Sequence, residues 1–156
     1  MKQRKVLSLL LLIIGAIAVG GFLLSRFQSS NEFGIYLAES NELVISDREV
    51  VSYNRTSHQI RLTDEGVERV KKMDLYHKTF VAKLSGKELY NGSFWSDMDS
   101  IPYKGVAIID IALIQRGFTN TLRIDPCYPP TFCLDVDPRD NLELLEYFQR
   151  TGKLIE

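Results

Sequence analysis

The sequence has 156 residues, of which 45% are hydrophobic and 2 are cysteines. This length suits one ordinary domain, and the composition excludes a disordered chain, a collagen-like repeat and a disulfide-dense miniprotein. Four of the 19 basic residues precede position 31, so residues 32–156 hold 15 basic against 20 acidic side chains, a net charge of −5. Nucleic-acid binding needs a basic surface, and we therefore expect no nucleic-acid partner.

A short basic tail, residues 1–5, is followed by 19 apolar residues, 6–24, in which Ser8 is the only polar side chain. As a helix this segment would be about 28 Å long, close to the hydrocarbon thickness of a bilayer. Three basic side chains precede it and Arg26 alone follows it closely. The positive-inside rule then predicts a single-pass protein of the cell membrane, anchored in the lipid bilayer through residues 6–24, with a cytoplasmic N-terminus and the C-terminal domain outside.

The alternative for this segment is a cleaved signal peptide, with Ala16 to Ala18 as the small-residue cleavage site. Cleavage there would leave an apolar stretch at the new N-terminus, so we favour the uncleaved anchor. In either case a polar linker, residues 25–32, leads into an extracytoplasmic domain, residues 33–156.

The first part of this domain predicts two strands and a short helix. Alternating apolar residues favour a strand over 33–39, and the apolar run 43–45 favours a second. Ser46 to Glu49 fits a capping box, so a short helix should begin at Asp47. Turn-forming residues at 53–57 are expected to follow it.

The middle of the domain predicts a strand, a helix and a hairpin. A strand over 58–62 leads into a helix over 64–74, for which Thr63 is the expected N-cap. Residues 79–84 and 88–95 flank a turn that contains glycine, which is typical of a β-hairpin.

The apolar stretch 105–114 predicts a central buried strand, and residues 121–125 predict another. In this order, the strands and helices predict an α+β domain with a small, largely antiparallel sheet that packs against two or three helices.

The last element should be a helix that begins with Asp137 as its N-cap and ends at Gly152. Its expected buried stripe consists of Leu142, Leu145 and Phe148, because these residues recur at helical spacing.

The segment from Ile60 to about Tyr90 contains IRLTDEGVERV and then HKTFVAKLSGKELY. It resembles part of the extracytoplasmic region of SecD, the membrane subunit that assists protein export. The residues that fit the family's pattern are Asp64, Glu65, Gly66, Lys78, Phe80, Leu84 and Gly86. Those that depart from it are His77, Thr79 and Ser85, where the family has Gly, Pro and Asp.

The resemblance implies a strand–helix–strand–hairpin unit that is held outside a membrane. It does not imply export activity, because the multi-span membrane portion that would use a proton gradient is not in this sequence. Fold-level analogy leaves function open.

Cys127 and Cys133 bracket a loop of five residues. Outside the cytoplasm we expect them to form a local disulfide, and in a reducing setting they would be two free thiols. Asn54 and Asn91 each begin an N-x-S/T sequence, so both are potential glycosylation sites if the host glycosylates exported proteins.

The sequence contains no motif that identifies a catalytic, metal or cofactor site. His58 and His77 are expected to be structural, and Asp97 and Asp99 to lie in a solvated loop. Aromatic residues near the end of the hairpin, Tyr90, Phe94 and Trp95, favour a core role over a recognition surface.

We therefore expect the domain to act by binding or assembly, without catalysis, and its partner to be an envelope or membrane protein. One alternative is a membrane-tethered hydrolase or transferase whose site is assembled from distant residues. The other is a secreted binder of a small ligand, released by signal cleavage.

Overall fold

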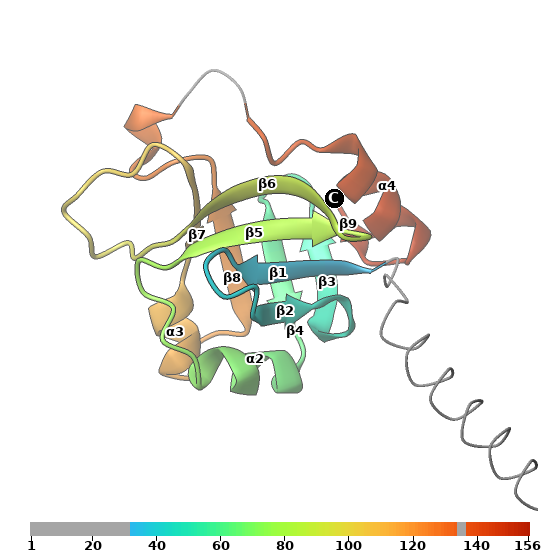
Figure 1. The fold of residues 1–156 in the computed structure, drawn as a ribbon, viewed down its shortest axis with the longest axis horizontal. Coiled ribbons are helices and arrows are strands. Elements are labelled where there is room, and N and C mark those ends of the chain that lie inside the picture. Colours follow the sequence, from blue (N-terminus) through green and yellow to red (C-terminus); the bar gives the residue numbers. More distant parts are fainter. Residues whose placement is uncertain (1–31, 134–136) are drawn as a thin grey trace, which may run out of the picture. The chain divides into compact units, whose positions relative to one another are not determined.

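The computed structural model describes residues 32–133 and 137–156 (Figure 1). The predicted basic tail 1–5, the transmembrane helix 6–24 and the linker up to residue 31 lie outside the described residues. Within the described ranges, none of the helices is both long and apolar enough to cross a membrane.

The described residues form nine strands and three α-helices, with two short 3₁₀ helices. The strands are β1 (Phe33–Leu37), β2 (Leu43–Ser46), β3 (Val50–Asn54), β4 (Gln59–Leu62), β5 (Thr79–Leu84), β6 (Lys87–Phe94), β7 (Val106–Ile109), β8 (Thr121–Asp125) and β9 (Leu154–Ile155). The helices are η1 (Asp47–Glu49), α2 (Asp64–Lys71), α3 (Ile111–Gln115), η2 (Pro130–Phe132) and α4 (Leu142–Arg150).

All nine strands belong to one sheet, in the order β2-β1-β5-β6-β7-β8-β4-β3-β9. Every neighbouring pair is antiparallel except β6 with β7 and β3 with β9. Strands β1, β5 and β6 pass in front of β8, β4 and β3 at a steep angle, so the sheet folds over on itself (Figure 1). This arrangement confirms the prediction of an α+β fold with a largely antiparallel sheet.

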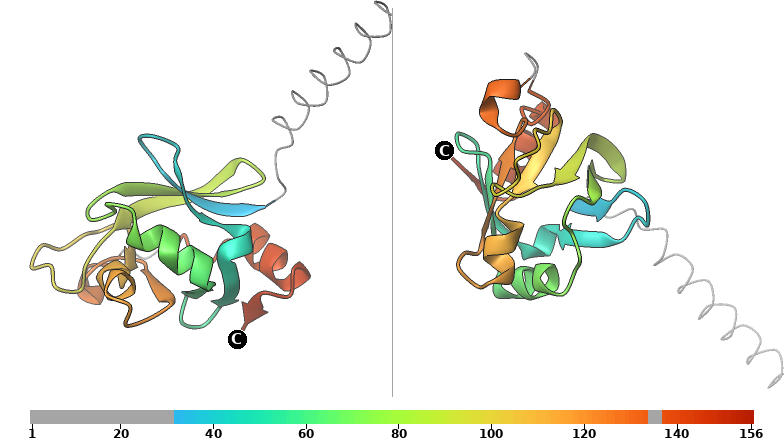
Figure 2. Two further views of the ribbon diagram at one scale, coloured as in Figure 1. Left: turned by 90° about the horizontal axis from the view of Figure 1, so that it is seen from below. Right: turned by 90° about the vertical axis from the view of Figure 1, so that its left-hand side faces the viewer.

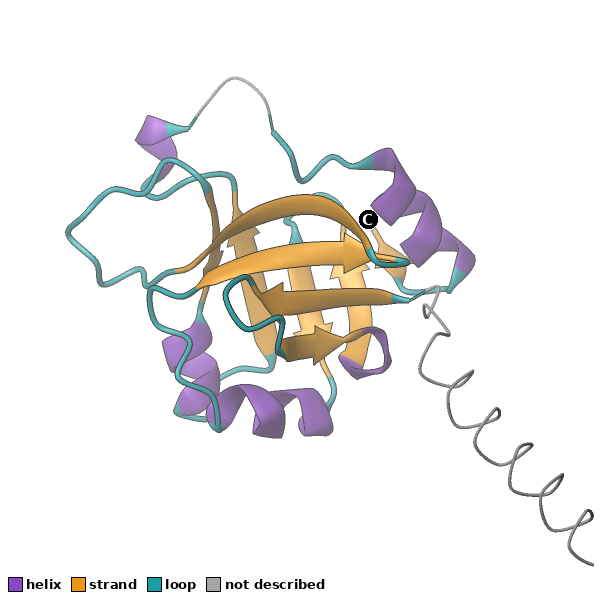
Figure 3. Cartoon of the chain, viewed as in Figure 1, coloured by secondary structure: helices purple, strands orange, loops and turns teal. Residues whose placement is uncertain are grey.

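The helices lie at the rim of the folded sheet (Figure 3). At one end α2 buries Val67 and Val70, and Thr63 caps it by accepting a hydrogen bond from the Gly66 amide at 3.2 Å, as the sequence predicts. At another end α4 inserts Phe148, which stacks on Tyr53 of β3 and meets Phe33 of β1 edge-on, with ring centroids 5.1 Å apart in both pairs. One apolar core therefore joins both layers of the sheet and the helices.

Two segments differ from the sequence predictions because of single residues. The apolar stretch 105–114 is not one strand: β7 ends at Ile109, and Asp110 has a φ of +74°, which turns the chain into α3. In the C-terminal helix the N-cap is Asn141, whose side chain accepts from the Leu144 amide at 3.2 Å. Asp137 instead pairs with Arg139, so the helix starts later than predicted.

Two strands were not predicted at all. Tyr53, in the stretch predicted as a turn, is a fully buried residue of β3, and β9 follows the last helix.

A buried carboxylate links η1 to α2. Glu49 accepts hydrogen bonds from the amide and hydroxyl of Ser46, both at 2.8 Å, and from Arg69 Nε at 2.7 Å. Burial by itself would raise the pKa of Glu49, but the bonds from Ser46 and Arg69 outweigh it and lower the pKa below its usual value. The capping box predicted at this position thus also holds α2 against β2 and η1.

Glu49→Gln should destabilise the protein at pH 7 by about 2 kcal/mol, because charge-assisted bonds to Ser46 and Arg69 are weakened. Since the pKa of Glu49 is lower when folded, its contribution is complete above the unfolded pKa of about 4.3 and disappears as the pH falls through the folded pKa. The difference between wild type and variant in urea unfolding should therefore shrink as the pH falls below about 4.3. The exposed carboxylate of Glu146, changed to Gln, is the control, and an equal pH dependence in both variants would contradict the prediction.

Candidate functional site

Four aromatic rings from two connections of the chain form one continuous stack. Tyr76 and His77 precede β5, Trp95 follows β6, and Tyr103 precedes β7. Successive ring centroids are 3.9, 4.1 and 5.0 Å apart, and successive planes are inclined by only 21° to 24°.

Backbone hydrogen bonds fix the positions of these rings. The His77 amide donates to Phe94 O at 3.0 Å, and the Trp95 amide donates to Ile108 O at 2.9 Å. Tyr103 exchanges two backbone hydrogen bonds with Tyr128, of 2.6 and 2.7 Å. The stack is therefore built on the ends of β6 and β7 and on the segment that follows β8.

Asp99 holds the exposed end of the stack. Its carboxylate accepts from the Tyr76 hydroxyl, lies 3.2 Å from His77 Nε2 and accepts from the Ser96 amide at 3.2 Å. Burial raises the pKa of Asp99, but these hydrogen bonds lower it further and the net pKa lies below its usual value. Asp99 is therefore ionised at neutral pH, and its side chain is only 12% exposed, contrary to the solvated position expected for it.

A pocket of about 350 Å³ opens beside the stack. Its lining includes Tyr76, Trp95, Met98 and Asp99, together with Ile111 and Gln115 of α3. Tyr76 is 53% exposed and Met98 is 77% exposed, which is high for large apolar side chains. We call the group Tyr76, His77, Trp95, Met98 and Asp99 the Trp95 surface.

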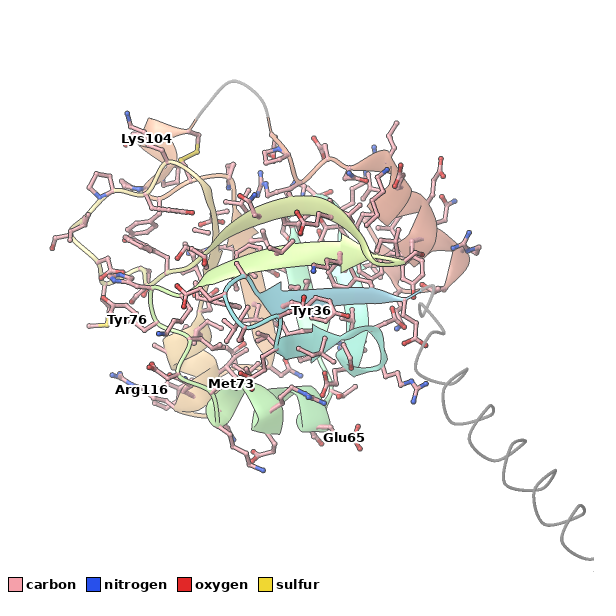
Figure 4. All side chains as sticks on the ribbon, viewed as in Figure 1. Tyr36, Glu65, Met73, Tyr76, Lys104 and Arg116 are labelled. Carbon is pink, nitrogen blue, oxygen red and sulfur yellow. A yellow bond between two sulfur atoms is a disulfide. The ribbon has the colours of Figure 1, made fainter. Side chains whose placement is uncertain are left out.

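The loop that carries Met98 projects from the end of the sheet and is drawn in yellow in Figure 2 (left). Tyr76 lies at the same end of the molecule, away from α4 (Figure 4). A hydrogen bond from the Tyr128 hydroxyl to Asp97 O ties this loop to the segment after β8.

Cys127 and Cys133 lie in that same segment, and their sulfur atoms are 2.11 Å apart, within bonding distance. The predicted disulfide pair is therefore present. Cys127 directly precedes Tyr128, whose hydroxyl bonds the loop that carries Met98.

The two histidines lie in different environments. His58 is buried, with Nδ1 2.7 Å from the Tyr53 hydroxyl, and burial lowers its pKa. His77 is part of the Trp95 surface. Across residues 32–133 and 137–156, neither histidine is hydrogen-bonded to a serine, threonine or cysteine side chain.

Of the aromatic residues singled out in the hairpin, Tyr90 and Phe94 are buried, as expected for core residues. Trp95 is only half-buried and belongs to the surface stack instead. The sequence gives no signal that Tyr76 and Tyr103 would join it, because each lies more than seven residues from Trp95 and reaches it only through the fold.

The two glycosylation sequences differ in accessibility. The Asn54 side chain accepts from the Ser57 amide at 2.7 Å and donates to Glu156 O at 3.2 Å, whereas Asn91 is exposed in β6. Glycosylation of either residue stays a prediction. In the part of the chain that the structure describes, no group of three or more His, Cys, Asp or Glu side chains is placed to hold a metal ion.

Comparison of the chain with family models, with curated proteins and with solved structures finds no match. The similarity of residues 60–90 to SecD therefore stays a prediction. Elements in this segment do occur in the order strand, helix, strand, strand, and β5 and β6 form a hairpin.

Proposed function

We propose that the chain is a single-pass membrane protein whose extracytoplasmic domain binds an envelope or membrane protein through the Trp95 surface, without catalysis. The observation that carries this proposal is the exposure of Tyr76 and Met98 at the rim of a 350 Å³ pocket. Tryptophan, tyrosine and methionine are the residue types enriched where proteins bind one another. Exposed apolar side chains that cluster beside polar groups mark a surface at which a partner binds.

The membrane anchor in this proposal rests on the 19-residue apolar segment 6–24 and on the basic residues before it. The Cys127–Cys133 pair supports an extracytoplasmic position for the domain, because disulfides persist in oxidising compartments. A reporter enzyme fused after Glu156 tests the topology: activity only of the type that works outside the cytoplasm is expected, and activity confined to the cytoplasm would overturn it.

A photoreactive amino acid at Met98 of the full chain in native membranes tests the binding surface. We expect irradiation to link it to one membrane or envelope protein, and the link to disappear when Trp95 is also changed to Ala. The matched control is the same amino acid at Leu142, which is 72% exposed on α4 at the other end of the domain. Equal products from both positions, or none from Met98, would contradict the proposal.

The pocket also favours a second candidate function, a secreted binder of a small ligand, because its volume is in the range of small-molecule sites. This function requires removal of the N-terminal segment. N-terminal sequencing of the mature protein separates the two: a start beyond residue 18 favours the secreted binder, and an intact start favours the anchored protein.

The contact of His77 with Asp99 is the feature that a membrane-tethered hydrolase or transferase would use to orient a general base. Such a mechanism also needs a nucleophile within reach of the base. Stacking of His77 between Tyr76 and Trp95 instead supports a structural role for this ring.

A further inference from the structure

The polar atoms that border the pocket of the Trp95 surface include acceptors and donors, and the charged group among them, Asp99, is an acceptor. The Asp99 carboxylate is ionised, and Tyr76 uses its hydroxyl proton to bond Asp99, which leaves only lone pairs on the Tyr76 oxygen. The Gln115 amide group donates one N–H to Met73 O at 3.0 Å, so its second N–H and its carbonyl oxygen stay available. Trp95 Nε1 is a buried donor without a hydrogen-bond partner among the described residues. A ligand that complements the Asp99 carboxylate and the Tyr76 oxygen must supply donors.

Two further carboxylates lie on the same loop and at the start of α3. Asp97 is exposed on this loop. Burial raises the pKa of Asp110, Arg123 lowers it, and Asp97 raises it by a smaller contribution. His77 is the one basic side chain within ion-pair distance of Asp99 among the described residues. An anionic ligand would be repelled here, and a cation would be attracted.

The apolar part of the site fits a planar cation on an aliphatic stem. His77 covers one face of Tyr76, and Tyr76 ends the stack and is 53% exposed, so its other face is open to a ligand. A guanidinium group stacks well on a tyrosine face and also binds a carboxylate through paired hydrogen bonds. The side chains of Met98 and Ile111 offer an apolar wall to the methylene groups of the stem.

We infer that the Trp95 surface accepts an arginine side chain of the partner protein, with the guanidinium stacked on Tyr76 next to Asp99. This inference rests on the proposed function, because it names the chemistry of the partner that the Trp95 surface binds. It excludes acidic segments as ligands and predicts that arginine is preferred over its neutral analogue citrulline.

The chain's only tryptophan, Trp95, reports binding directly through its fluorescence. The full chain in lipid nanodiscs is titrated with the peptide acetyl-Gly-Arg-Leu-Gly-amide and with the same peptide containing citrulline or glutamate in place of arginine. We expect a saturable change with the arginine peptide, at millimolar concentrations, and at least tenfold weaker binding of the other two. No saturable change with the arginine peptide, or equal binding of the citrulline peptide, would overturn the inference.

A pair of variants at Met98 tests the charge preference without altering the buried structure, because this side chain is 77% exposed. Met98→Lys should weaken binding of the arginine peptide about tenfold, and Met98→Glu should preserve or strengthen it. Asp99→Asn should weaken it by a similar factor, while Asp140→Asn, in the segment before α4, should leave it unchanged. Equal affinities of the Met98→Lys and Met98→Glu variants would overturn the inference.

The two experiments fail separately. If photocrosslinking at Met98 identifies a partner but arginine peptides do not bind, the proposed function stands and the arginine inference is wrong. If position 98 gives no specific crosslink and the arginine peptide does not bind, the proposed function and the arginine inference are both wrong.

Discussion

Replacing Gly92 with alanine should destabilise the protein by about 3 to 5 kcal/mol, a large part of the stability of an ordinary domain. A Cβ atom at this position would lie 2.0 Å from Val106 O and 2.8 Å from the Phe80 ring. The first of these neighbours is backbone, which cannot rotate away. Gly92 pairs with Val106 in the parallel β6–β7 ladder, so the added methyl group would separate two central strands.

Urea unfolding followed by far-UV circular dichroism and by Trp95 fluorescence measures this loss. Trp95 follows β6 and donates a hydrogen bond to Ile108 of β7, so separation of the strands should also change its fluorescence before denaturant is added. The control is Gly117→Ala, at a φ of +76° with no atom within 4 Å of the new Cβ, for which the cost should be about 1 to 2 kcal/mol. Equal stability of the two variants would show that β6 and β7 do not approach as closely as the structure has them.

The same two strands illustrate what the sequence predicts well and what it does not. The β5–β6 hairpin depends on the local turn at Ser85 and Gly86, and the sequence identifies it. The parallel pairing of β6 with β7 depends on residues more than ten positions apart, and no local pattern encodes it. Short-range signals such as the caps of η1 and α2 are therefore reliable here, and strand neighbours are not.

The functional site shows the same division. Trp95 stands out in the sequence, but the hairpin pattern favours a core position for it, and the core does hold its neighbour Phe94. Its actual surroundings come from Tyr76, in the connection between α2 and β5, and from Asp99 and Tyr103, in the connection between β6 and β7. From the sequence, Asp99 in SDMDS is predicted to lie in a solvated loop, because no local pattern indicates that Tyr76 and His77 contact its side chain.

Asp110 is a further case in which one residue alters the outcome. The nine other residues of the stretch 105–114 are apolar and favour a buried strand, and only the left-handed conformation at Asp110 ends β7 and starts α3. Aspartate adopts this conformation more readily than most residues, but its presence in an apolar stretch does not by itself predict that the strand ends there. The consequence is functional, because α3 supplies Ile111 and Gln115 to the pocket.

Two substitutions in α4, Leu142→Ala and Phe148→Ala, test where this helix begins. The sequence places Leu142 and Phe148 on one buried stripe, whereas in the structure Phe148 is fully buried and Leu142 is 72% exposed. Asn141 caps the helix immediately before Leu142, so Leu142 lies in the first turn, and the buried face begins with Leu144. Phe148→Ala should cost about 3 to 5 kcal/mol, because its ring contacts Tyr53 of β3 and Phe33 of β1 across both layers.

Leu142→Ala should change the free energy of unfolding by no more than about 0.5 kcal/mol, since it removes little buried surface. Both values come from urea unfolding at pH 7, monitored by far-UV circular dichroism. A decrease above 2 kcal/mol in the free energy of unfolding for Leu142→Ala would mean that Leu142 is buried on one stripe with Phe148, as the sequence predicts. It would also mean that α4 begins nearer to Asp137. A loss below 1 kcal/mol for Phe148→Ala would mean that α4 does not close the end of the folded sheet, and that β3 and β1 are held together by the remaining core alone.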